Sequence, residues 1–371
     1  MEVSPEILNL VPYKPGKPIS EAKREFGLQS VIKLASNENP LGASTLAMRA
    51  LVDGFSEAHN YPDPSGFELI HKIQEKWGWP AACVGLGNGS DEIFDLLIRI
   101  FCEKGDAILI PKYSFAAYKV SAHSSRIRVI EQEVDSEFEV DLDQLAHRFE
   151  SSSNDKIKMI FLANPNNPTG NFISATRIQK FLQRLKHRDD VLIVVDEAYN
   201  EFVNDSSHQS AFSLFEAQGN LIVTRTFSKA YGLAGFRVGA MVAPSQVIDL
   251  YHRVRKPFNM NHLGQLAAKI SLEDLDFLKR TQQITWDGLI QVAEGLTKLG
   301  LRHWKSAGNF ILFDTGFDSS VVDLALLKKG IILRPVKNYG LETHMRFSIG
   351  KPEDNAAALK ALGQVLTEWR N

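Results

Sequence analysis

Short apolar runs alternate with amphipathic stretches from about Leu34 to Pro257. Four of the runs stop at a polar residue or a turn residue: Ala107–Ile110, Ile157–Leu162, Val191–Val195 and Leu221–Val223. Such runs are typical of strands in a parallel sheet that is covered on both faces. Between them, apolar residues at i, i+3, i+4 and i+7 predict an amphipathic helix at Ile178, Phe181, Leu182 and Leu185. The alternation predicts an α/β fold with a doubly wound, mostly parallel sheet.

The two ends of the chain follow other patterns. Four prolines among polar residues predict that residues 5–30 are extended rather than helical. Beyond Pro257 the pattern predicts one long helix, two strands and a final helix, at His262–Leu299, Phe310–Phe313, Met345–Ile349 and Pro352–Trp369. We therefore expect an N-terminal arm over residues 1–33, a large domain over 34–258 and a smaller α+β domain over 259–371. The arm is expected to pack with the small domain or with a partner subunit.

Composition narrows the class of partner. A formal charge of −2 over 371 residues, with no basic stripe, gives no reason to expect nucleic acid, so we expect small-molecule substrates. The acidic start lacks the pattern of an export signal, and no apolar run approaches the roughly 20 residues that a membrane helix needs. Cys83 and Cys102 form no CxxC motif and the histidines no HExxH motif. We expect a cytoplasmic protein without a metal site.

Lys229 is the strongest candidate for covalent chemistry. It follows the apolar run Leu221–Val223, lies among small residues, and precedes Arg237 by eight positions. An amine held at the end of a strand suits a covalent Schiff base with a carbonyl carbon. A solvated surface lysine is the alternative. Two further segments favour chemistry, namely residues 164–170, which read Asn-Pro-Asn-Asn-Pro-Thr-Gly, and residues 196–199, which read Asp-Glu-Ala-Tyr.

Together and in this order, these segments resemble the pyridoxal-phosphate (PLP) aminotransferases of fold type I. The resemblance implies that Lys229 binds the cofactor covalently and later carries the proton from the substrate Cα. Asp196 is expected to keep the ring nitrogen protonated, since a nearby carboxylate favours the charged form. Tyr199 and Asn167 correspond to donors toward the phenolic oxygen of the ring.

A glycine-rich segment before the amphipathic run Ile93–Phe101 is a candidate phosphate site. Glycines let the backbone approach an anion, and the N–H groups of a helix start then point at it. The GxGxG spacing of Gly85–Gly89 does not fit a dinucleotide fingerprint, and an ordinary capped turn is the alternative. The resemblance assigns the cofactor phosphate to Gly89, Ser90, Asp91, Ser228 and Arg237.

Two tyrosines match other family positions. Tyr113 corresponds to an aromatic ring stacked on the cofactor, with a core residue as the alternative. Tyr61, in Asn-Tyr-Pro-Asp-Pro, resembles a tyrosine that reaches the phosphate of the neighbouring subunit, with a turn tyrosine as the alternative. The first interpretation of Tyr61 implies a homodimer with shared active sites.

The motifs are most similar to those of the histidinol-phosphate aminotransferases, from Tyr13 to the C-terminal helix. In that family Arg346 matches the arginine that grips the substrate's acidic group, and Arg334 matches a second arginine for the phosphate. Two guanidiniums suit a phosphate better than a carboxylate. Tyr13 and Asn39 are expected to add neutral hydrogen bonds to the substrate, and Asn167 also faces it.

The resemblance implies transamination of L-histidinol phosphate with 2-oxoglutarate, a step of histidine biosynthesis. Residues 334–341 look like a branch that also accepts aromatic amino acids, so an aromatic aminotransferase is an alternative. A PLP-dependent decarboxylase of an amino-acid phosphate would need the same fold and lysine. A ligand sensor without catalysis is a further alternative, although the full set of catalytic residues is surplus to sensing.

Overall fold

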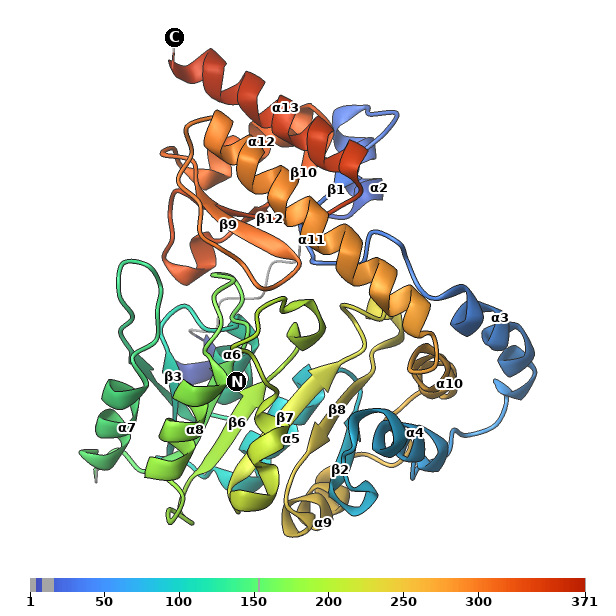
Figure 1. The fold of residues 1–371 in the computed structure, drawn as a ribbon, viewed down its shortest axis with the longest axis vertical. Coiled ribbons are helices and arrows are strands. Elements are labelled where there is room, and N and C mark those ends of the chain that lie inside the picture. The colour runs from blue at the N-terminus through green and yellow to red at the C-terminus, as the bar shows by residue number, and fades with distance from the viewer. Residues whose placement is uncertain (1–4, 9–16, 153, 371) are drawn as a thin grey trace.

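The larger part of the protein is built on one seven-stranded sheet in a computed structural model that describes residues 5–8, 17–152 and 154–370 (Figure 1). The strand order is β2-β8-β7-β6-β5-β3-β4, and only β8 runs against its neighbours. The expected doubly wound, mostly parallel sheet is confirmed. The strands are β2 (Val84–Gly87), β3 (Ala107–Pro111), β4 (Arg128–Gln132), β5 (Ile157–Ala163), β6 (Leu192–Asp196), β7 (Leu221–Thr226) and β8 (Gly239–Val242).

Alternate residues of these strands bury opposite faces of the sheet, as the pleat requires. In β6, Val194 packs with one core and Ile193 and Val195 with the other. The first core contains residues of α5 (Ser90–Phe101), α6 (Ala116–Ser124) and α9 (Ser245–Val254). The second contains residues of α3 (Thr45–Gly54), α4 (Phe67–Trp77), α7 (Leu142–Glu150), α8 (Ala175–Arg184) and α10 (His262–Ser271).

The C-terminal part forms a second layer above this sheet in Figure 1. Its antiparallel sheet has the order β11-β12-β9, and its core is covered by three helices. These elements are β9 (Phe310–Asp314), β11 (Arg334–Pro335), β12 (His344–Ser348), α11 (Leu275–Lys298), α12 (Ser319–Lys328) and α13 (Pro352–Arg370). No helix among the described residues is long and apolar enough to cross a lipid bilayer.

The N-terminal segment joins this second layer. β1 (Ile32–Lys33) pairs in parallel with β10 (Ile331–Ile332), and α2 (Ile19–Phe26) packs against α12. Ala22 and Ala35 share a small core with residues of the C-terminal part. Figure 1 shows the blue α2 and β1 beside the orange elements.

Two predictions from the sequence were wrong. Residues 5–30 are not extended throughout, because α1 (Pro5–Leu8) and α2 are helical. Proline is compatible with a helix start, and α2 begins directly after Pro18 and ends at Gly27 in the left-handed conformation. The expected helix His262–Leu299 is two helices, since Asp274 caps a new start by accepting the N–H of Phe277.

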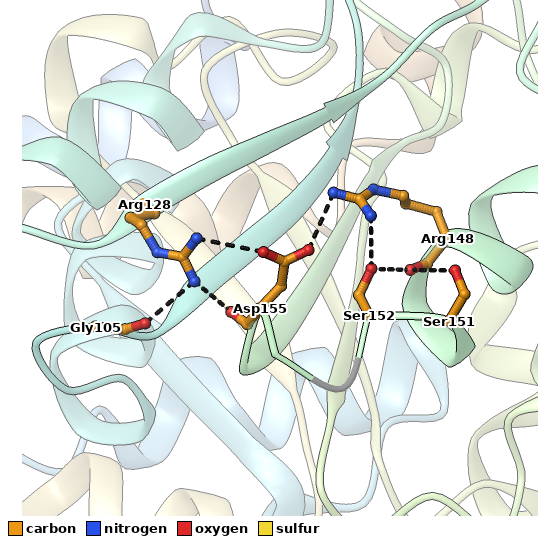
Figure 2. Close-up of polar contacts among 6 residues, drawn as sticks. All are labelled: Gly105, Arg128, Arg148, Ser151, Ser152 and Asp155. Atoms are coloured by element: carbon orange, nitrogen blue, oxygen red, sulfur yellow. Dashed lines mark hydrogen bonds and ion pairs between the residues drawn. The ribbon is translucent and has the colours of Figure 1, made fainter.

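The edge of the large sheet where β3, β4 and β5 begin is held by an arginine network (Figure 2). Arg128 donates to the carbonyl oxygens of Gly105 and Asp155, and Arg148 donates to the carboxylate of Asp155 and to Ser152. These side chains are partly exposed, so each ion pair contributes at most about 1 kcal/mol. We assign this edge a structural role, because the candidate catalytic residues lie at the opposite one.

Candidate active site

The predicted site residues gather where the parallel strands of the large sheet end. Asp196 is the last residue of β6, and Lys229 follows β7 by three residues. Asn167 follows β5, and Gly89 follows β2 at the start of α5. Ligands of open α/β sheets bind beyond this edge of the sheet.

Asp196 is buried, and both of its carboxylate oxygens accept hydrogen bonds. Tyr118 donates its hydroxyl to Oδ2 at 2.7 Å, and Thr224 donates to Oδ1 at 3.0 Å. Burial raises the pKa of Asp196 to about 6, while these two hydrogen bonds act in the opposite direction. The carboxylate is therefore fixed by two neighbouring elements and is mainly ionised at neutral pH.

Lys229 is partly exposed, and its Nζ donates to the carbonyl oxygen of Ser36 at 3.1 Å. Burial lowers the pKa of Lys229 to about 8, and the positive charge of Arg346 acts in the same direction. The negative charge of Asp91 acts on both Lys229 and Asp196. Lys229 and Asp196 thus share one electrostatic environment, and a larger fraction of the amine is neutral than in an ordinary lysine.

Tyr199 lies between these two groups and the second layer. Its buried hydroxyl accepts hydrogen bonds from Asn37 at 2.9 Å and from Asn167 at 3.3 Å. The Lys229 Nζ lies 5.9 Å from the centre of the Tyr199 ring. Burial raises the pKa of Tyr199 to about 12, so the hydroxyl keeps its proton and has it available for a further acceptor.

Gly89, Ser228 and Arg237 surround the start of α5 and form a candidate anion cradle. Arg237 donates to Ser228 Oγ at 3.4 Å and to the Asp91 carboxylate at 3.3 Å. Gly89 has φ 84°, and a Cβ at this position would overlap the Arg237 guanidinium. Burial raises the pKa of Asp91, while the charges of Arg237 and Lys229 oppose the rise.

Gly239 lets strand β8 pass close to the backbone at the start of α5, where the anion cradle forms. A Cβ at Gly239 would lie 2.5 Å from the backbone nitrogen of Ser90 and 2.6 Å from the carbonyl carbon of Gly89. Glycine is thus required where β8 passes the start of α5. The free N–H groups of a helix start then lie close to the Arg237 side chain, as an anion site needs.

The two predicted substrate arginines are partners across adjacent strands. Arg334 of β11 lies opposite Arg346 of β12 in the antiparallel pair. Arg346 is buried and donates to Asn167 Oδ1 and to the carbonyl oxygen of Ala35. Arg334 is half-buried, and its charge opposes the rise that burial causes in the pKa of Asp323.

The two predicted cofactor tyrosines lie in different environments. Tyr113 has φ 60°, a strained conformation for a bulky residue, and its carbonyl oxygen accepts a hydrogen bond from Asn166. Its ring meets Phe138 edge-on, so one side of the ring packs against the protein. Tyr61 is 81% exposed and stacks on Phe258, so most of its surface is available to another molecule.

Asn39 and Tyr13 are the remaining predicted substrate contacts. The Asn39 amide donates to the carbonyl oxygen of Ala230 and to Thr281, and its Oδ1 accepts the N–H of Leu41. Its polar atoms are therefore engaged with the protein itself. Tyr13 lies outside the described residues.

Sequence reasoning missed several polar residues of the site. Tyr118 and Thr224 hold Asp196, while Asn37 donates to Tyr199 and accepts from Ser348. One signal was available for Asn37, since it lies two positions before Asn39 in residues 36–40, which read Ser-Asn-Glu-Asn-Pro. Nothing in the spacing of Tyr118 indicates a bond to a residue 78 positions away.

The residues present fit pyridoxal phosphate as a bound group. A cradle of one guanidinium, one serine hydroxyl and a helix start suits the phosphate. The buried carboxylate of Asp196, whose two oxygens each accept a hydrogen bond, suits a protonated ring nitrogen. Lys229 has a lowered pKa and suits covalent attachment to an aldehyde. Two observations support this fit. A Cβ at Gly89 or Gly239 would fill the cradle or overlap its backbone, and the carboxylate of Asp196 is buried.

Comparison with known proteins gives a consistent result. The family "aminotransferase class I and II" matches residues 29–362. A histidinol-phosphate aminotransferase of Bdellovibrio bacteriovorus is 50% identical over 99% of both chains. Histidinol-phosphate aminotransferase 2 of Ralstonia nicotianae is 41% identical over 99% of this chain and 98% of that one.

A solved structure agrees with these relatives. The histidinol-phosphate aminotransferase of Sinorhizobium meliloti, in complex with pyridoxal-5'-phosphate, matches with a TM-score of 0.88 and 25% identity. The match covers 99% of this chain and 98% of that one. The expected fold type I architecture is thereby confirmed.

Proposed function

The chain belongs to the class I and II aminotransferases and, within them, to the histidinol-phosphate aminotransferases, and from this premise we propose its reaction. It transfers the amino group of L-histidinol phosphate to 2-oxoglutarate with PLP as cofactor, giving imidazole acetol phosphate and glutamate. The proposal places the protein in histidine biosynthesis as a cytoplasmic enzyme.

One observation carries the proposal. Lys229 and Asp196 are 33 positions apart in the sequence, yet the charge of Asp91 acts on both. Arg346 acts on Lys229 and is the cross-strand partner of Arg334. A reactive amine, a buried carboxylate and two guanidiniums in one site suit an amino-group transfer on an anionic substrate. This combination favours transamination of a phosphorylated amine over sensing.

PLP, when bound, supplies an aldehyde carbon and an electron-accepting ring. Gly89, Ser90, Asp91, Ser228 and Arg237 would hold its phosphate. Tyr113 would cover the ring. Asp196 would hold a proton at the ring nitrogen, and Asn167 and Tyr199 would donate toward the phenolic oxygen.

Lys229 Nζ would be the atom that holds the cofactor aldehyde and that carries the proton of the substrate Cα. Both roles need a neutral amine, and the lowered pKa of Lys229 makes that form accessible near pH 8. In the cofactor-free chain, the carbonyl oxygen of Ser36 accepts a hydrogen bond from this amine. Tyr199 stays protonated because its pKa is raised, so it acts as a donor at the working pH.

Arg334 and Arg346 would bind the acidic groups of the substrates. A phosphate offers more acceptor oxygens and more charge than a carboxylate, and a pair of arginines on one face of a sheet matches it. Arg346 would also serve the carboxylate of the amino acceptor. Tyr13 would also contact the substrate. Asn39 would contribute by holding the backbone of Ala230 and Leu41 beside the substrate.

The active form is proposed to be a homodimer. Large apolar side chains are exposed on α3, on the turn after it and at the start of α4, at the right of Figure 1. They are Leu46, Met48, Val52, Phe55 and Phe67. Exposed apolar patches of this kind mark interfaces, and Tyr61 stands in the same stretch. In the dimer Tyr61 would reach the cofactor phosphate of the partner subunit.

Substrate turnover tests the proposal. Purified protein with PLP is expected to consume 2-oxoglutarate with histidinol phosphate faster than with phenylalanine. A preference for phenylalanine would favour an aromatic aminotransferase. Release of carbon dioxide without use of 2-oxoglutarate would favour a decarboxylase, and no turnover of either kind would favour a sensor.

A mixing experiment tests the shared site. Chains carrying Tyr61→Phe are combined with chains carrying Lys229→Ala under conditions that exchange subunits. A site that keeps Lys229 then receives an intact Tyr61 only if this residue comes from the partner. Recovery of wild-type PLP affinity at that site supports the proposal, and affinity that stays at the Tyr61→Phe level contradicts it.

A further inference from the structure

Tyr118 is a fully buried tyrosine whose hydroxyl reaches the site from α6. It donates to Asp196 Oδ2 at 2.7 Å, and its ring is held by three aromatic neighbours. Phe161 stacks on it at 4.8 Å, and Phe94 and Phe115 meet it edge-on. Such packing leaves the ring little freedom to turn, so the hydroxyl is fixed toward the carboxylate.

Protonation of Asp196 would weaken the hydrogen bonds that its carboxyl group accepts, because bonds to an ionised carboxylate are stronger than bonds to a neutral one. The Asp196 oxygens accept from Tyr118 and Thr224, and the backbone N–H of Ala198 also lowers the pKa of this carboxyl group. An ionised carboxylate only accepts, whereas the protonated form brings a proton of its own. Since burial raises the pKa of Tyr118 well above its ordinary value, the phenol cannot yield its proton instead.

We propose that Tyr118 is a positioning residue that keeps Asp196 ionised and oriented for the ring nitrogen of the cofactor. The inference rests on the proposed function for its purpose, but the effect on the carboxyl group is a property of the chain alone. Thr224 supports the second oxygen from β7 in the same way.

The other groups around Asp196 do not replace Tyr118. Asp91 of α5 carries the same charge as Asp196 and so disfavours ionisation. Tyr199 is neutral near pH 7, because burial raises its pKa to about 12. The hydrogen-bond donors Tyr118, Thr224 and Ala198 therefore act most strongly in favour of the charged form of Asp196.

Tyr118→Phe is the direct test, because it removes one oxygen and keeps the ring in its aromatic environment. The full-length protein is labelled with carbon-13 at the aspartate carboxyl carbons, and Asp196→Asn identifies the signal. In the cofactor-free chain we expect the pKa of Asp196 to rise from about 6 by about one unit or more. The acid limb of the kcat/KM profile of the PLP-loaded enzyme should move upward by a similar amount.

Two further variants separate positioning from loss of packing. Tyr251→Phe is the matched control, since Tyr251 is also fully buried and donates to a backbone carbonyl, that of Leu86. It should leave the titration of Asp196 unchanged. Thr224→Val removes a hydroxyl donor and should raise the pKa of Asp196. Thr224→Ser keeps the donor and should leave this pKa close to the wild-type value.

An unchanged titration of Asp196 in Tyr118→Phe overturns the inference, and so does an equal shift in Tyr251→Phe. If Tyr118→Phe fails to fold, Thr224→Val against Thr224→Ser decides by the same measurement. Failure of the wild-type enzyme to transaminate would refute the proposed function, while the titration in the cofactor-free chain would still test the role of Tyr118.

Discussion

Arg334 and Arg346 lie directly opposite each other on two antiparallel strands, although like charges in this position repel each other. Arg346 is held by Asn167 and by the carbonyl oxygen of Ala35, which links the second layer of the protein to the strand ends of the first. Two cations on one face are stabilised when an anion with several oxygens binds between them. This arrangement supports the proposed role of the pair in binding a phosphorylated substrate.

Replacing Arg334 by glutamine should impair phosphorylated substrates selectively. Loss of charge-assisted hydrogen bonds is expected to lower kcat/KM for histidinol phosphate about 10- to 100-fold. The value for phenylalanine should change little. Steady-state kinetics with both substrates check this, with the exposed Arg253→Gln as control. Equal losses for the two substrates would contradict a phosphate role.

Lys229→Ala should abolish transamination while leaving noncovalent PLP binding. The variant lacks the proton carrier and the covalent attachment, so kcat should fall by at least about 10⁴-fold. Single-turnover assays and equilibrium dialysis with PLP check the two parts. Lys279→Ala, at another lysine of the chain, is the control. Substantial residual turnover would exclude Lys229 as the base.

Lys229 should also make the stability of the cofactor-free protein depend on pH. Its folded pKa is about 8, below the ordinary value of 10.5, so the unfolded chain binds its proton more tightly. Stability is therefore lowered below pH 8 and recovers as the pH rises from 8 to 10.5. Lys229→Met should stabilise the protein at pH 7 by about 2 kcal/mol, less than the full shift implies because the side chain is partly exposed. Urea unfolding at pH 7 and pH 10.5 checks this, and a gain that does not shrink at the higher pH would contradict it.

Gly239→Ala should disrupt the phosphate cradle. The new Cβ would overlap the backbone of Gly89 and Ser90, which cannot move aside as a flexible side chain can. We expect a loss of about 1 to 3 kcal/mol in unfolding free energy and a weaker affinity for PLP. Gly219→Ala is the matched control, since a Cβ there meets no atom within 4 Å. Unchanged PLP affinity in Gly239→Ala would show that the start of α5 is not the phosphate site.

Arg225→Met should destabilise the fold beneath the site. Arg225 pairs with the buried Glu197 at 3.1 Å, and burial raises the pKa of the nearby Glu201 to about 7, which Arg225 opposes. Removing the cation leaves two buried carboxyl groups, so a loss of about 3 to 5 kcal/mol is expected. The folded state of the variant would then hold a proton on Glu201 more tightly than the unfolded chain does, so the loss should be larger at pH 8 than at pH 5.

Urea unfolding of Arg225→Met at both pH values gives the measurement. Arg253→Met, at an exposed i,i+4 ion pair, is the control and should cost under about 1 kcal/mol. The double variant with Glu197→Gln should recover part of the loss. A cost for Arg225→Met no larger than that of the control would contradict a structural role for the buried pair.

The sequence predicted the parts of the fold that local pattern determines. The apolar runs before Asp196 and Lys229 indicated buried parallel strands, and the candidate residues were expected at their ends. The direction of β8 was not predictable, because a strand of Gly239–Val242 reads the same whichever way it pairs. Helix α2 was missed because the prolines around it outweighed the favourable pair of Pro18 and Gly27.

The contacts that define the site depend on tertiary packing. Tyr118 meets Asp196, and Asn37 meets Tyr199, only after distant segments have folded together. A buried tyrosine with an apolar surround reads as an ordinary core residue in the sequence. Donors such as Tyr118 and Asn37 can be recognised only when their acceptors are known. The residues expected to touch the cofactor are therefore easier to predict than the residues that position them.

Asp196 ends β6 and Glu197 follows it, and the two carboxylates accept hydrogen bonds from Thr224 and Arg225, which are neighbours on β7. Because neighbouring residues of a strand point to opposite faces of a sheet, the two carboxylates lie on opposite faces. Deleting a single residue from the middle of β6 would move each carboxylate to the face of the sheet that the other now occupies. Asp196 would then lie on the face where Glu197 now pairs with Arg225, and Glu197 would take the place of Asp196 in the proposed cofactor site. Substitutions in β6 are thus better tolerated than changes in its length, which limits how this segment can evolve.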